Sequence, residues 1–500
     1  MKKGSLAIVS TGIPQISAAK DPSVSSPGIA TQESKYGVAF GAVWMFTLLI
    51  YLRPNELFPE IFGTLSIIKF VAITAVLAYA GGKLSNGEPL STGLIEVKMM
   101  VLLAALCLLL MPFAAAPHES WDVFNDTFSK VVLIFILMVN LLDTRKRLLS
   151  LINIVLVGGV WIAAGALKSY MEGKDLLLAK GVPGRIAFAG GGMFGNPNDL
   201  ADALDLLIPL AVALGLCRKG ILRWLYFAAA ALFVVTVQIT FSRGGFLGLV
   251  TLGGYMMWKL GRGRRVKMIF VGAIVLGATV MASPGGFANR VSTIFDSSKD
   301  QTGSSYQRRQ LLERALLVVR SRPFGVGMGN YHMYSVNEEK AHNGYLEISA
   351  ELGLLGLLAY LIINFKPLFR LRRMEKELGI SPQGQDKEDY YLCVALQAIL
   401  VSYVVCSFFA SIEYLWYLYY PAAYSIALTQ IFEKERAGIG SNVALVPIQS
   451  SIQAPVPKAS GGVLWATRRR GDGVLWRQAQ KSPTKIIKER GRLWKRAKVT

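Results

Sequence analysis

Residues 221–260 read ILRWLYFAAAALFVVTVQITFSRGGFLGLVTLGGYMMWKL, and this stretch decides the class of fold. Two apolar runs, at 221–241 and 245–260, are joined by the short polar turn FSRGG. Each run approaches the roughly twenty residues that a helix needs to cross the hydrocarbon core of a bilayer. The strands of a membrane barrel would instead alternate apolar and polar residues. The stretch therefore predicts two membrane-spanning helices joined by a very tight turn.

Apolar runs of similar length recur along the rest of the chain. The 500 residues are 53% hydrophobic with a mean hydropathy of +0.42, which is too apolar for a soluble multidomain protein. The sequence predicts an all-α, polytopic membrane protein with about 12 transmembrane helices. We expect these spans near residues 37–52, 62–80, 98–116, 128–142, 148–167, 199–216, 221–241, 245–260, 266–282, 344–365, 390–409 and 412–432.

Basic residues in the short loops predict the orientation of these spans, because cytoplasmic loops carry the excess of lysine and arginine. The basic clusters all fall on one side of the membrane if the spans alternate. They lie at residues 145–147, 218–219, 259–267 and 366–376, and in the C-terminal tail. Both termini are therefore expected in the cytoplasm. A large helical loop at 283–343, between the ninth and tenth spans, is expected on the periplasmic side.

Composition divides the chain into three parts. Residues 1–35 are rich in serine, proline and alanine and predict a disordered cytoplasmic leader. Residues 36–433 form the transmembrane body, and residues 434–500 form a basic cytoplasmic tail. In the tail, Leu-Trp pairs alternate with arginine and lysine, which suits contact with membrane lipids of an anionic leaflet. An unstructured, solvated tail is the alternative.

The net charge of +22 lies mostly in the tail and in the cytoplasmic loops. Its distribution follows the loops that are expected inside the cell, so it is explained by membrane topology. No nucleic-acid partner is therefore expected.

The guanidinium of Arg243 is expected at or just inside the outer membrane interface, within the tight turn. A cation costs about 2.5–3.5 kcal/mol at the centre of a spanning helix, and less near the surface. Gly244 and Gly245 leave room for a ligand to approach closely, and a lipid-linked phosphate is the anion present at that depth. Arginine binds phosphate oxygens through two parallel hydrogen bonds. The alternative is that the side chain simply extends to lipid headgroups.

A second external loop carries Arg185 and a glycine-rich run at 190–195. It leads into a helix that starts at Pro197, because proline is disfavoured further inside a helix. Asn198 or Asp199 is expected to cap that helix.

Asp202 and Asp205 follow along one side of the same helix. At 1.5 Å per residue, Asp205 lies about 10 Å into the membrane. Ionisable groups at that depth normally face a cavity or a partner cation. The two aspartates are therefore expected either to pair with an arginine such as Arg185 or to orient a sugar hydroxyl.

The large external loop at 283–343 is crowded with guanidinium groups. Within it, residues 306–319 carry apolar side chains at helical spacing and predict an amphipathic helix that lies on the membrane. Arg308 and Arg309 stand at its start, where the helix dipole opposes a cation, so a bound counter-anion is expected. The glycine-rich run after Pro323 lacks the Lys-Ser/Thr ending of a nucleotide-binding loop.

His342 closes this loop at the entrance of the next span. Imidazole titrates near pH 6.5, so it can take a proton from a hydroxyl group. The alternative is a polar side chain that is satisfied by water. No grouping of histidine, aspartate and glutamate has metal-ligand spacing, so neither a metal nor a cofactor is expected. Arginines must then neutralise any diphosphate.

Several of these residues occur together in one recognisable order. The sequence has SRG at 242–244, Arg308, PFGVG at 323–327 and HNGYLE at 342–347. This pattern resembles the O-antigen ligase and O-antigen polymerase superfamily, over a core at about residues 184–365. The spans before and after the core fit the family's plan. The resemblance implies a metal-independent, inverting glycosyltransferase of the bacterial inner membrane.

The resemblance also implies roles for individual residues. It assigns Arg243 and Arg308 to the diphosphate of an undecaprenyl-diphosphate-linked glycan donor, with Arg185 as a further arginine. It assigns His342 as the catalytic residue that deprotonates an acceptor hydroxyl at the periplasmic face. The arginines would stabilise the charge that grows on the leaving diphosphate in the transition state. Residues left as acceptor-binding or structural are Asp202, Asp205 and Arg309.

The acceptor is expected to be lipid A core, another polysaccharide or a protein. The first alternative is an O-antigen or exopolysaccharide polymerase, which would use the same chemistry to extend a lipid-linked glycan. A lipid-linked glycan transporter is a more distant alternative. A transporter predicts charged residues near mid-membrane in both halves of the chain and no large external loop.

Overall fold

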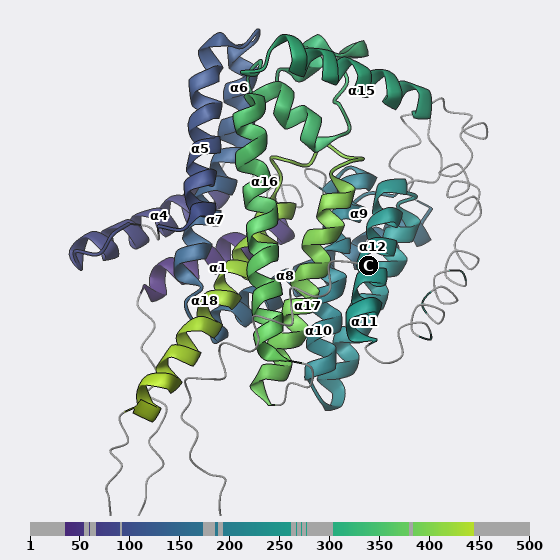
Figure 1. Ribbon diagram of the computed structural model, residues 1–500. Helices are drawn as coiled ribbons and strands as arrows, with labels where there is room; N and C mark the ends of the chain where they lie inside the picture. The colour runs from purple at the N-terminus through teal and green to yellow at the C-terminus, as the bar shows by residue number, and fades with distance from the viewer. Residues whose placement is uncertain are drawn as a thin grey trace, which may run out of the picture. The chain divides into compact units, whose positions relative to one another are not determined.

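The fold is that of a computed structural model, which describes 36–54, 60, 67–90, 93–173, 186–188, 194–261, 267, 272, 277, 304–379 and 384–444, with 304–306 and 438–444 as backbone only. The chain divides into two compact units, Met1–Asn442 and Val443–Thr500. The described helices lie in the first unit, apart from the last two residues of the final helix (Figure 1). The predicted leader, Arg185 and most of the predicted tail lie outside the described residues, as does most of the predicted span at 266–282.

Every regular element in the described part of the chain is a helix, so the all-α prediction is confirmed there. The α-helices are α1 (Gly37–Leu52), α4 (Ile67–Ser85), α5 (Ile95–Leu110), α6 (Pro117–Val123), α7 (Ser129–Leu141), α8 (Arg145–Met171), α9 (Pro197–Asp205), α10 (Leu207–Cys217), α11 (Gly220–Ile239), α12 (Arg243–Leu260), α15 (Ser304–Ser321), α16 (Gly344–Leu378), α17 (Gln385–Cys406) and α18 (Trp416–Ala444). The short turns of other helix types are η1 (Met111–Phe113), η2 (Phe124–Phe128), η6 (Tyr331–Tyr334) and η7 (Val336–Glu338). Of these, η2 is π-helical.

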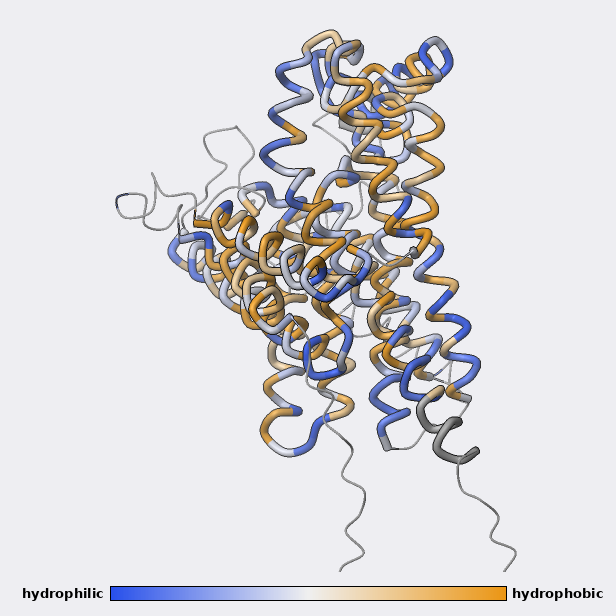
Figure 2. Tube along the Cα trace, turned by 90° about the vertical axis from the view of Figure 1, so that its left-hand side faces the viewer, coloured by the Kyte–Doolittle hydropathy of each residue, from blue (hydrophilic) through white to orange (hydrophobic). Residues whose placement is uncertain are grey.

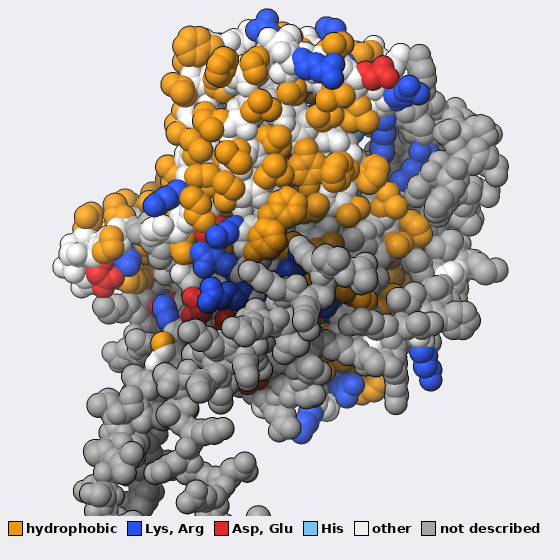
Figure 3. Space-filling view, viewed as in Figure 1, with side chains coloured by type: hydrophobic (Ala, Val, Ile, Leu, Met, Phe, Trp, Pro, Cys, Tyr) orange, Lys and Arg blue, Asp and Glu red, His pale blue; other side chains and the backbone are white. Residues whose placement is uncertain are grey.

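Seven helical segments in the described residues are long and apolar enough to cross a membrane. They are Ile67–Ser85, Ile95–Phe113, Arg145–Met171, Pro197–Cys217, Gly220–Ile239, Gly344–Leu378 and Gln385–Cys406. α1 is a shorter apolar helix. A polytopic membrane protein is therefore supported, whereas the count of about twelve spans stays a prediction. Figure 2 shows apolar residues along the helices, and Figure 3 shows an apolar face with lysine and arginine above and below it.

α16 is longer than the sequence predicted. Its span was expected to end near residue 365, with a basic loop at 366–376, but the helix continues to Leu378. Polar side chains support this extension, because Arg373 pairs with Glu377 one turn later (Nε to Oε1, 3.3 Å). The basic segment is therefore a helical extension and not a loop.

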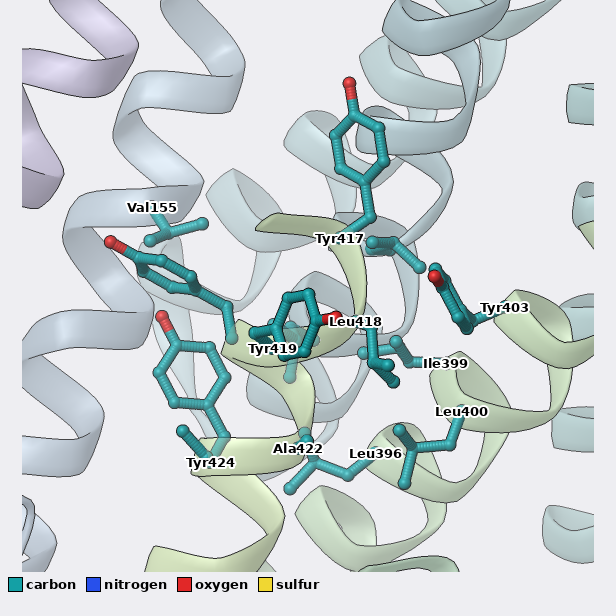
Figure 4. Close-up of a cluster of buried hydrophobic side chains, with 14 of the residues drawn as sticks. Val155, Leu396, Ile399, Leu400, Tyr403, Tyr417, Leu418, Tyr419, Ala422 and Tyr424 are labelled. Atoms are coloured by element: carbon teal, nitrogen blue, oxygen red, sulfur yellow. The ribbon is translucent and has the colours of Figure 1, made fainter. Parts of the chain in front are cut away.

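The core of the first unit is built from apolar and aromatic side chains of α17 and α18, packed against α8 and α10. Figure 4 shows tyrosines of α18, among them Tyr419 and Tyr424, among aliphatic residues of α17 such as Leu396 and Ile399. Tyr403 and Tyr360 join α17 to α16 through their hydroxyl groups, 2.7 Å apart. Buried hydroxyls that bond to each other avoid the cost of an unsatisfied polar group, so they fix how these helices pack.

Ion pairs between helices hold one end of this bundle. Arg145, at the start of α8, pairs with Asp389 of α17 and with Glu435 of α18. Lys259, at the end of α12, pairs with Glu375 near the end of α16 (Nζ to Oε2, 2.7 Å). Two further pairs are Arg218 with Glu388 and Arg370 with Glu96. The described residues of the predicted basic clusters at 145–147, 218–219, 259–267 and 366–376 thus lie together at one end of the helices.

α15 lies across the opposite ends of the bundle helices in Figure 1. It was expected to rest its apolar face on the membrane. Instead Leu311, Ala315 and Val318 are buried, and Ala315 and Val318 pack with Tyr331 and Ala350. The helix itself is confirmed, but this part of its apolar face covers the protein because the segment between α15 and α16 folds back beneath it.

Candidate active site

A cavity of about 560 Å³ lies among the helix ends opposite to the ion pairs. α12 begins at the cavity and carries Lys259 near its other end, while α17 ends next to the cavity and carries Asp389 near its start. The lining comes from α6 with η2, the starts of α9 and α12, α15, the segment before α16 and the turn between α17 and α18. Its polar residues are Asp122, Asp126, Thr127, Asn196, Asn198, Asp199, Asp202, Ser242, Arg308, Lys340, His342, Ser411, Glu413 and Tyr414.

His342 is held in place by the residues that follow it in the HNGYLE motif. The side chain of Asn343 caps α16 by accepting from the backbone N–H of Leu346 (3.0 Å). The carboxylate of Glu347 accepts from the backbone N–H of Ala341 (3.0 Å) and from the hydroxyl of Ser411. His342 itself adopts a left-handed conformation (φ 49°) between these two anchors. The motif therefore fixes the backbone on both sides of the imidazole.

The surroundings of His342 favour its neutral form. Burial lowers the pKa of the imidazole below its ordinary value, and the cations Arg308 and Lys340 lower this pKa further. Glu339 opposes them in part. An imidazole that is neutral at neutral pH has a free nitrogen, so it can accept a proton from a hydroxyl group.

The structure brings Arg308 and His342 to the same cavity. Arg243 is half-buried at the start of α12, between Ser242 and Gly244, which both line the cavity. Arg309 does not line it and pairs on the surface with Glu313 (Nε to Oε1, 3.1 Å).

The start of α12 is fixed against α9. The hydroxyl of Ser242 donates to Asn198 Oδ1 (2.9 Å) and accepts from the N–H of Gly245 (3.1 Å), which makes it the N-cap of α12. A Cβ atom on Gly245 would come within 2.5 Å of Ala201, so only glycine permits this approach of the two helices. The cap of α9 is Asn196, whose side chain accepts from the N–H of Asn198 (2.9 Å). The expectation of a cap at Asn198 or Asp199 was wrong, because Pro197 takes the first helical position and the cap must precede it.

Asp202 and Asp205 lie in the core at the start of the α9–α10 segment. They are 4% and 1% exposed. Within the described residues neither forms an ion pair, and Asp202 Oδ1 and both oxygens of Asp205 have no hydrogen-bond partner. Asp202 lines the cavity, whereas Asp205 packs against Gly248 of α12. The expected pairing with Arg185 stays a prediction, since Arg185 lies outside the described residues.

The PFGVG run has a structural role beside α16. Gly325 and Gly353 have φ of +99° and +70°, and the two segments exchange backbone hydrogen bonds. Val326 N donates to Ala350 O (2.9 Å), and Leu354 N donates to Pro323 O (3.2 Å). Gly353 interrupts α16 because its neighbours bond to this run and not only along the helix.

The residues that follow the run attach it to α6. The amide of Asn330 accepts from the N–H of Ala116 (2.6 Å), and the hydroxyl of Ser120 donates to the carbonyl of Met328 (2.7 Å). The segment therefore fixes α6, which carries Asp122, relative to α16, which follows His342.

Lys340 and Glu413 are cavity residues that the sequence argument missed. Glu347, Glu413 and further carboxylates raise the pKa of Lys340 against the opposing effect of desolvation, so this exposed lysine is a stable cation near acidic groups. Glu413 is 2% exposed, and burial together with Glu347 and Glu351 holds its pKa well above the ordinary value. The available signal for Glu413 was a carboxylate at the second residue of the last predicted span, just after the tight break that precedes it.

Within the described residues no group of three or more histidine, cysteine, aspartate or glutamate side chains is arranged to hold a metal ion. The independence from metal that the sequence predicts is untested by this arrangement and stays a prediction.

Known proteins resemble this chain over the region that contains these residues. Residues 228–361 match the family model described as O-antigen ligase, and this range includes Arg243, Arg308 and His342. The O-antigen ligase of Salmonella typhimurium is 28% identical over 207 residues, which cover 37% of this chain and 49% of that protein. An uncharacterized protein of Haemophilus influenzae is 24% identical over 167 residues, covering 29% and 42%. The matches therefore span about half the length of these curated relatives. They confirm the resemblance to the O-antigen ligase superfamily.

Proposed function

We propose that this chain, with its O-antigen ligase domain at 228–361, transfers a glycan from undecaprenyl diphosphate to an acceptor hydroxyl. The acceptor would be lipid A core, a polysaccharide or a protein, and the reaction would occur at the periplasmic face of the bacterial inner membrane. One observation carries the proposal. A histidine with a lowered pKa and an arginine from a distant helix line one cavity among the helix ends opposite the ion-paired basic segments.

The arginines would act on the leaving group. When the bond between the anomeric carbon and the diphosphate breaks, negative charge grows on the bridging oxygen. Arginine is a permanent cation in proteins, so Arg308 and Arg243 can each offer two parallel N–H donors to phosphate oxygens. Because this charge is larger in the transition state than in the bound donor, fixed cations accelerate the step without a metal.

His342 would act on the acceptor. A neutral imidazole takes the proton of the acceptor hydroxyl as its oxygen attacks the anomeric carbon from the side opposite to the diphosphate. This displacement inverts the configuration of the sugar. The lowered pKa of His342 supports the assignment, because a protonated imidazole cannot be a base.

Lys340 would keep the cavity able to bind an anion. Buried carboxylates such as Glu347 and Glu413 lie near the site and would repel a diphosphate if they were ionised. A lysine whose pKa they raise remains charged beside them and offsets part of their field.

The test uses purified full-length protein in lipid nanodiscs, with a lipid-linked glycan, candidate acceptors and a chelator. Transfer should proceed in the chelator, and mass spectrometry of the product should show the glycan joined to one acceptor. A product extended on a second lipid-linked glycan would instead identify a polymerase. His342→Ala should lower the rate by about 10²–10⁴-fold, the usual contribution of a positioned base.

Two neighbouring arginines supply a matched control. Arg308→Ala should lose transfer because its side chain lines the cavity, while Arg309→Ala should keep it because Arg309 is 79% exposed and paired with Glu313. Normal transfer by the His342→Ala protein would show that His342 is not the base. Loss of transfer on chelation would show that the mechanism depends on a metal.

A further inference from the structure

We propose that the carboxylate wall of the cavity, formed by Asp122, Asp126, Asp199 and Asp202, binds a sugar of the acceptor and disfavours sugars that carry an acidic group. The inference rests on the proposed function and adds the class of acceptor sugar to it. All four residues line the same cavity as His342 and Arg308.

Two separate regions of the chain build this wall. Asp122 belongs to α6, and Asp126 with Thr127 belongs to the π-helical turn η2 that joins α6 to α7. A π-helical turn holds one residue more than an α-helical turn, which rotates the side chains before it relative to those after it, and such turns are frequent at functional sites. Phe128 at the end of η2 is buried and packs its ring on Tyr414 (5.3 Å between centroids). The turn is therefore anchored while Asp126 and Thr127 remain at the cavity.

The second region is the start of α9. Asn196 and Asn198 position it, and Asp199 and Asp202 follow one helical turn apart on the side that faces the cavity. The wall thus presents carboxylate groups from two directions. Sugar hydroxyls are donors that fit carboxylates, because each carboxylate oxygen can accept more than one hydrogen bond.

A buried oxygen without a hydrogen-bond partner indicates that the wall is built for a donor group. Asp202 is 4% exposed, lines the cavity, and its Oδ1 has no hydrogen-bond partner within the described residues. Buried acceptors of this kind destabilise a protein unless something donates to them. A sugar hydroxyl or a sugar ammonium group can do so, whereas a sugar carboxylate cannot.

Charge gives the wall its selectivity. The cations of the cavity are Arg308 and Lys340, and the diphosphate of the donor would occupy the guanidinium. Lys340, which the proposed function also assigns to an anion, would face the same diphosphate. Lys69 also lies beside the wall, but it is already paired with Asp126 (Nζ to Oδ1, 3.9 Å). A second anion on the acceptor would therefore meet mainly carboxylates, and like charges at short range repel. The wall should accept neutral or aminated sugars and reject uronic acids.

The experiment measures this selectivity with two acceptors that are identical except that one ends in glucose and the other in glucuronic acid. The ratio of kcat/KM for the neutral acceptor to that for the acidic acceptor should be high for the unchanged protein. In Asp122→Asn, Asp126→Asn and the double variant, this ratio should fall, by about tenfold for the pair. The fall should come from better use of the acidic acceptor and a higher KM for the neutral one, with kcat little changed.

Folding does not confound this test, because Asp122 and Asp126 are exposed. Asp386→Asn, on an exposed aspartate at the start of α17, is the matched control and should leave the ratio unchanged. If the unchanged protein transfers to neither acceptor, the proposed function fails. If it transfers and the Asp122 and Asp126 variants keep its ratio, the carboxylate wall is wrong as an acceptor site while the proposed function stands.

Discussion

At His342, the neighbouring charges decide whether the imidazole can accept a proton. Burial, Arg308 and Lys340 lower its pKa, and Glu339 raises it. A base works only in its deprotonated form, so the rate of transfer should fall as the pH drops through this lowered pKa. The acid limb of the pH–rate profile should therefore lie below pH 6.5, the ordinary value for histidine.

Replacing Glu339 by glutamine should move the acid limb to lower pH. Glu339 stabilises the protonated imidazole, so its removal lowers the pKa of His342 further and leaves the base deprotonated in more acidic solution. The rate at the plateau should stay nearly the same, because Glu339 does not line the cavity. The measurement is kcat/KM for transfer between roughly pH 4.5 and pH 8, a range that covers the titration of a histidine.

Glu338→Gln is the matched control for this prediction. Glu338 is the adjacent glutamate, is exposed, and is not among the groups that shift the pKa of His342. A profile that moves equally in both variants would mean that His342 is not the group whose titration limits the rate.

Site residues that belong to a sequence motif could be predicted from the sequence. Site residues that only the folded structure brings together could not. His342 and Arg308 were identified through the order of the motif pieces. Lys340 and Glu413 were missed because their chemistry depends on carboxylates that approach from other helices, which local spacing does not reveal. Asp122 and Asp126 were missed for the same reason.

At the scale of elements, the PFGVG run and α16 form one unit. Near Gly353, backbone groups of α16 form hydrogen bonds with the run and not only within the helix. Gly353 adopts φ +70° and ψ −174° there. That conformation is almost restricted to glycine. The unit connects the anchored end of α16, next to His342, to α6.

Gly353→Ala should destabilise the protein and reduce transfer. An alanine Cβ at this position would lie 2.6 Å from the carbonyl oxygen of Pro323, and the backbone conformation itself disfavours an L-residue by about 1–3 kcal/mol. The free energy of unfolding should drop by at least that amount, measured as a lower thermal midpoint in nanodiscs, with transfer measured on the same sample.

Gly41→Ala in α1 supplies the control for the cost of glycine replacement. Its Cβ would meet nothing within 4 Å, and its conformation is helical, so the change should stabilise the helix by up to about 1 kcal/mol. Equal effects of the two substitutions would show that the break in α16 is not held by the PFGVG run.

The sequence predicted that the helices exist better than it predicted where they end and what they pack against. Apolar runs located most spans because the bilayer imposes a length on them. The sequence did not predict the extension of α16 to Leu378, because its residues are charged and a charged run after an apolar span is typical of a loop. The burial of Leu311 and Ala315 against the protein was missed because an apolar stripe does not reveal whether lipid or protein covers it.

At the scale of the whole bundle of helices, the charged side chains are arranged differently at the two ends. One end joins cations and carboxylates into ion pairs between helices, as in Lys259 with Glu375. The other end keeps carboxylates around a cavity. If α16 crosses the bilayer once, these ends face opposite compartments.

Cysteine labelling tests this sidedness. Glu338→Cys precedes α16, and Arg373→Cys lies near its other end, where the arginine side chain is 82% exposed. In spheroplasts, a membrane-impermeant maleimide should label position 338 directly and position 373 only after the membrane is opened.

The native cysteines interfere little, because Cys107, Cys393 and Cys406 are buried and Cys217 is half-buried. The unchanged protein provides the background signal. Labelling of both introduced cysteines from the outside would contradict the single crossing of α16 and the periplasmic position of the cavity.

The class of the whole molecule could be predicted from sequence, whereas the arrangement around the site could not. Mean hydropathy and the length of the apolar runs predicted an all-helical membrane protein. The alternation of basic segments along the chain predicted which helix ends lie together, and those ends carry the ion pairs. The meeting of α6, α9, α12 and α15 at one cavity depends on close helix contacts such as Gly245 on Ala201, which only the packed structure reveals.

Asp202 Oδ1, which has no hydrogen-bond partner within the described residues, also bears on the lifetime of the protein in the cell. An occupant that donates to it binds the native state and not the unfolded chain, and at a hundred times its dissociation constant it would add about 2.7 kcal/mol to the free energy of unfolding. Copies that carry their substrates would then outlast vacant copies when quality-control proteases sample the membrane. A cell that stops making the acceptor would then lose the protein by turnover soon afterwards.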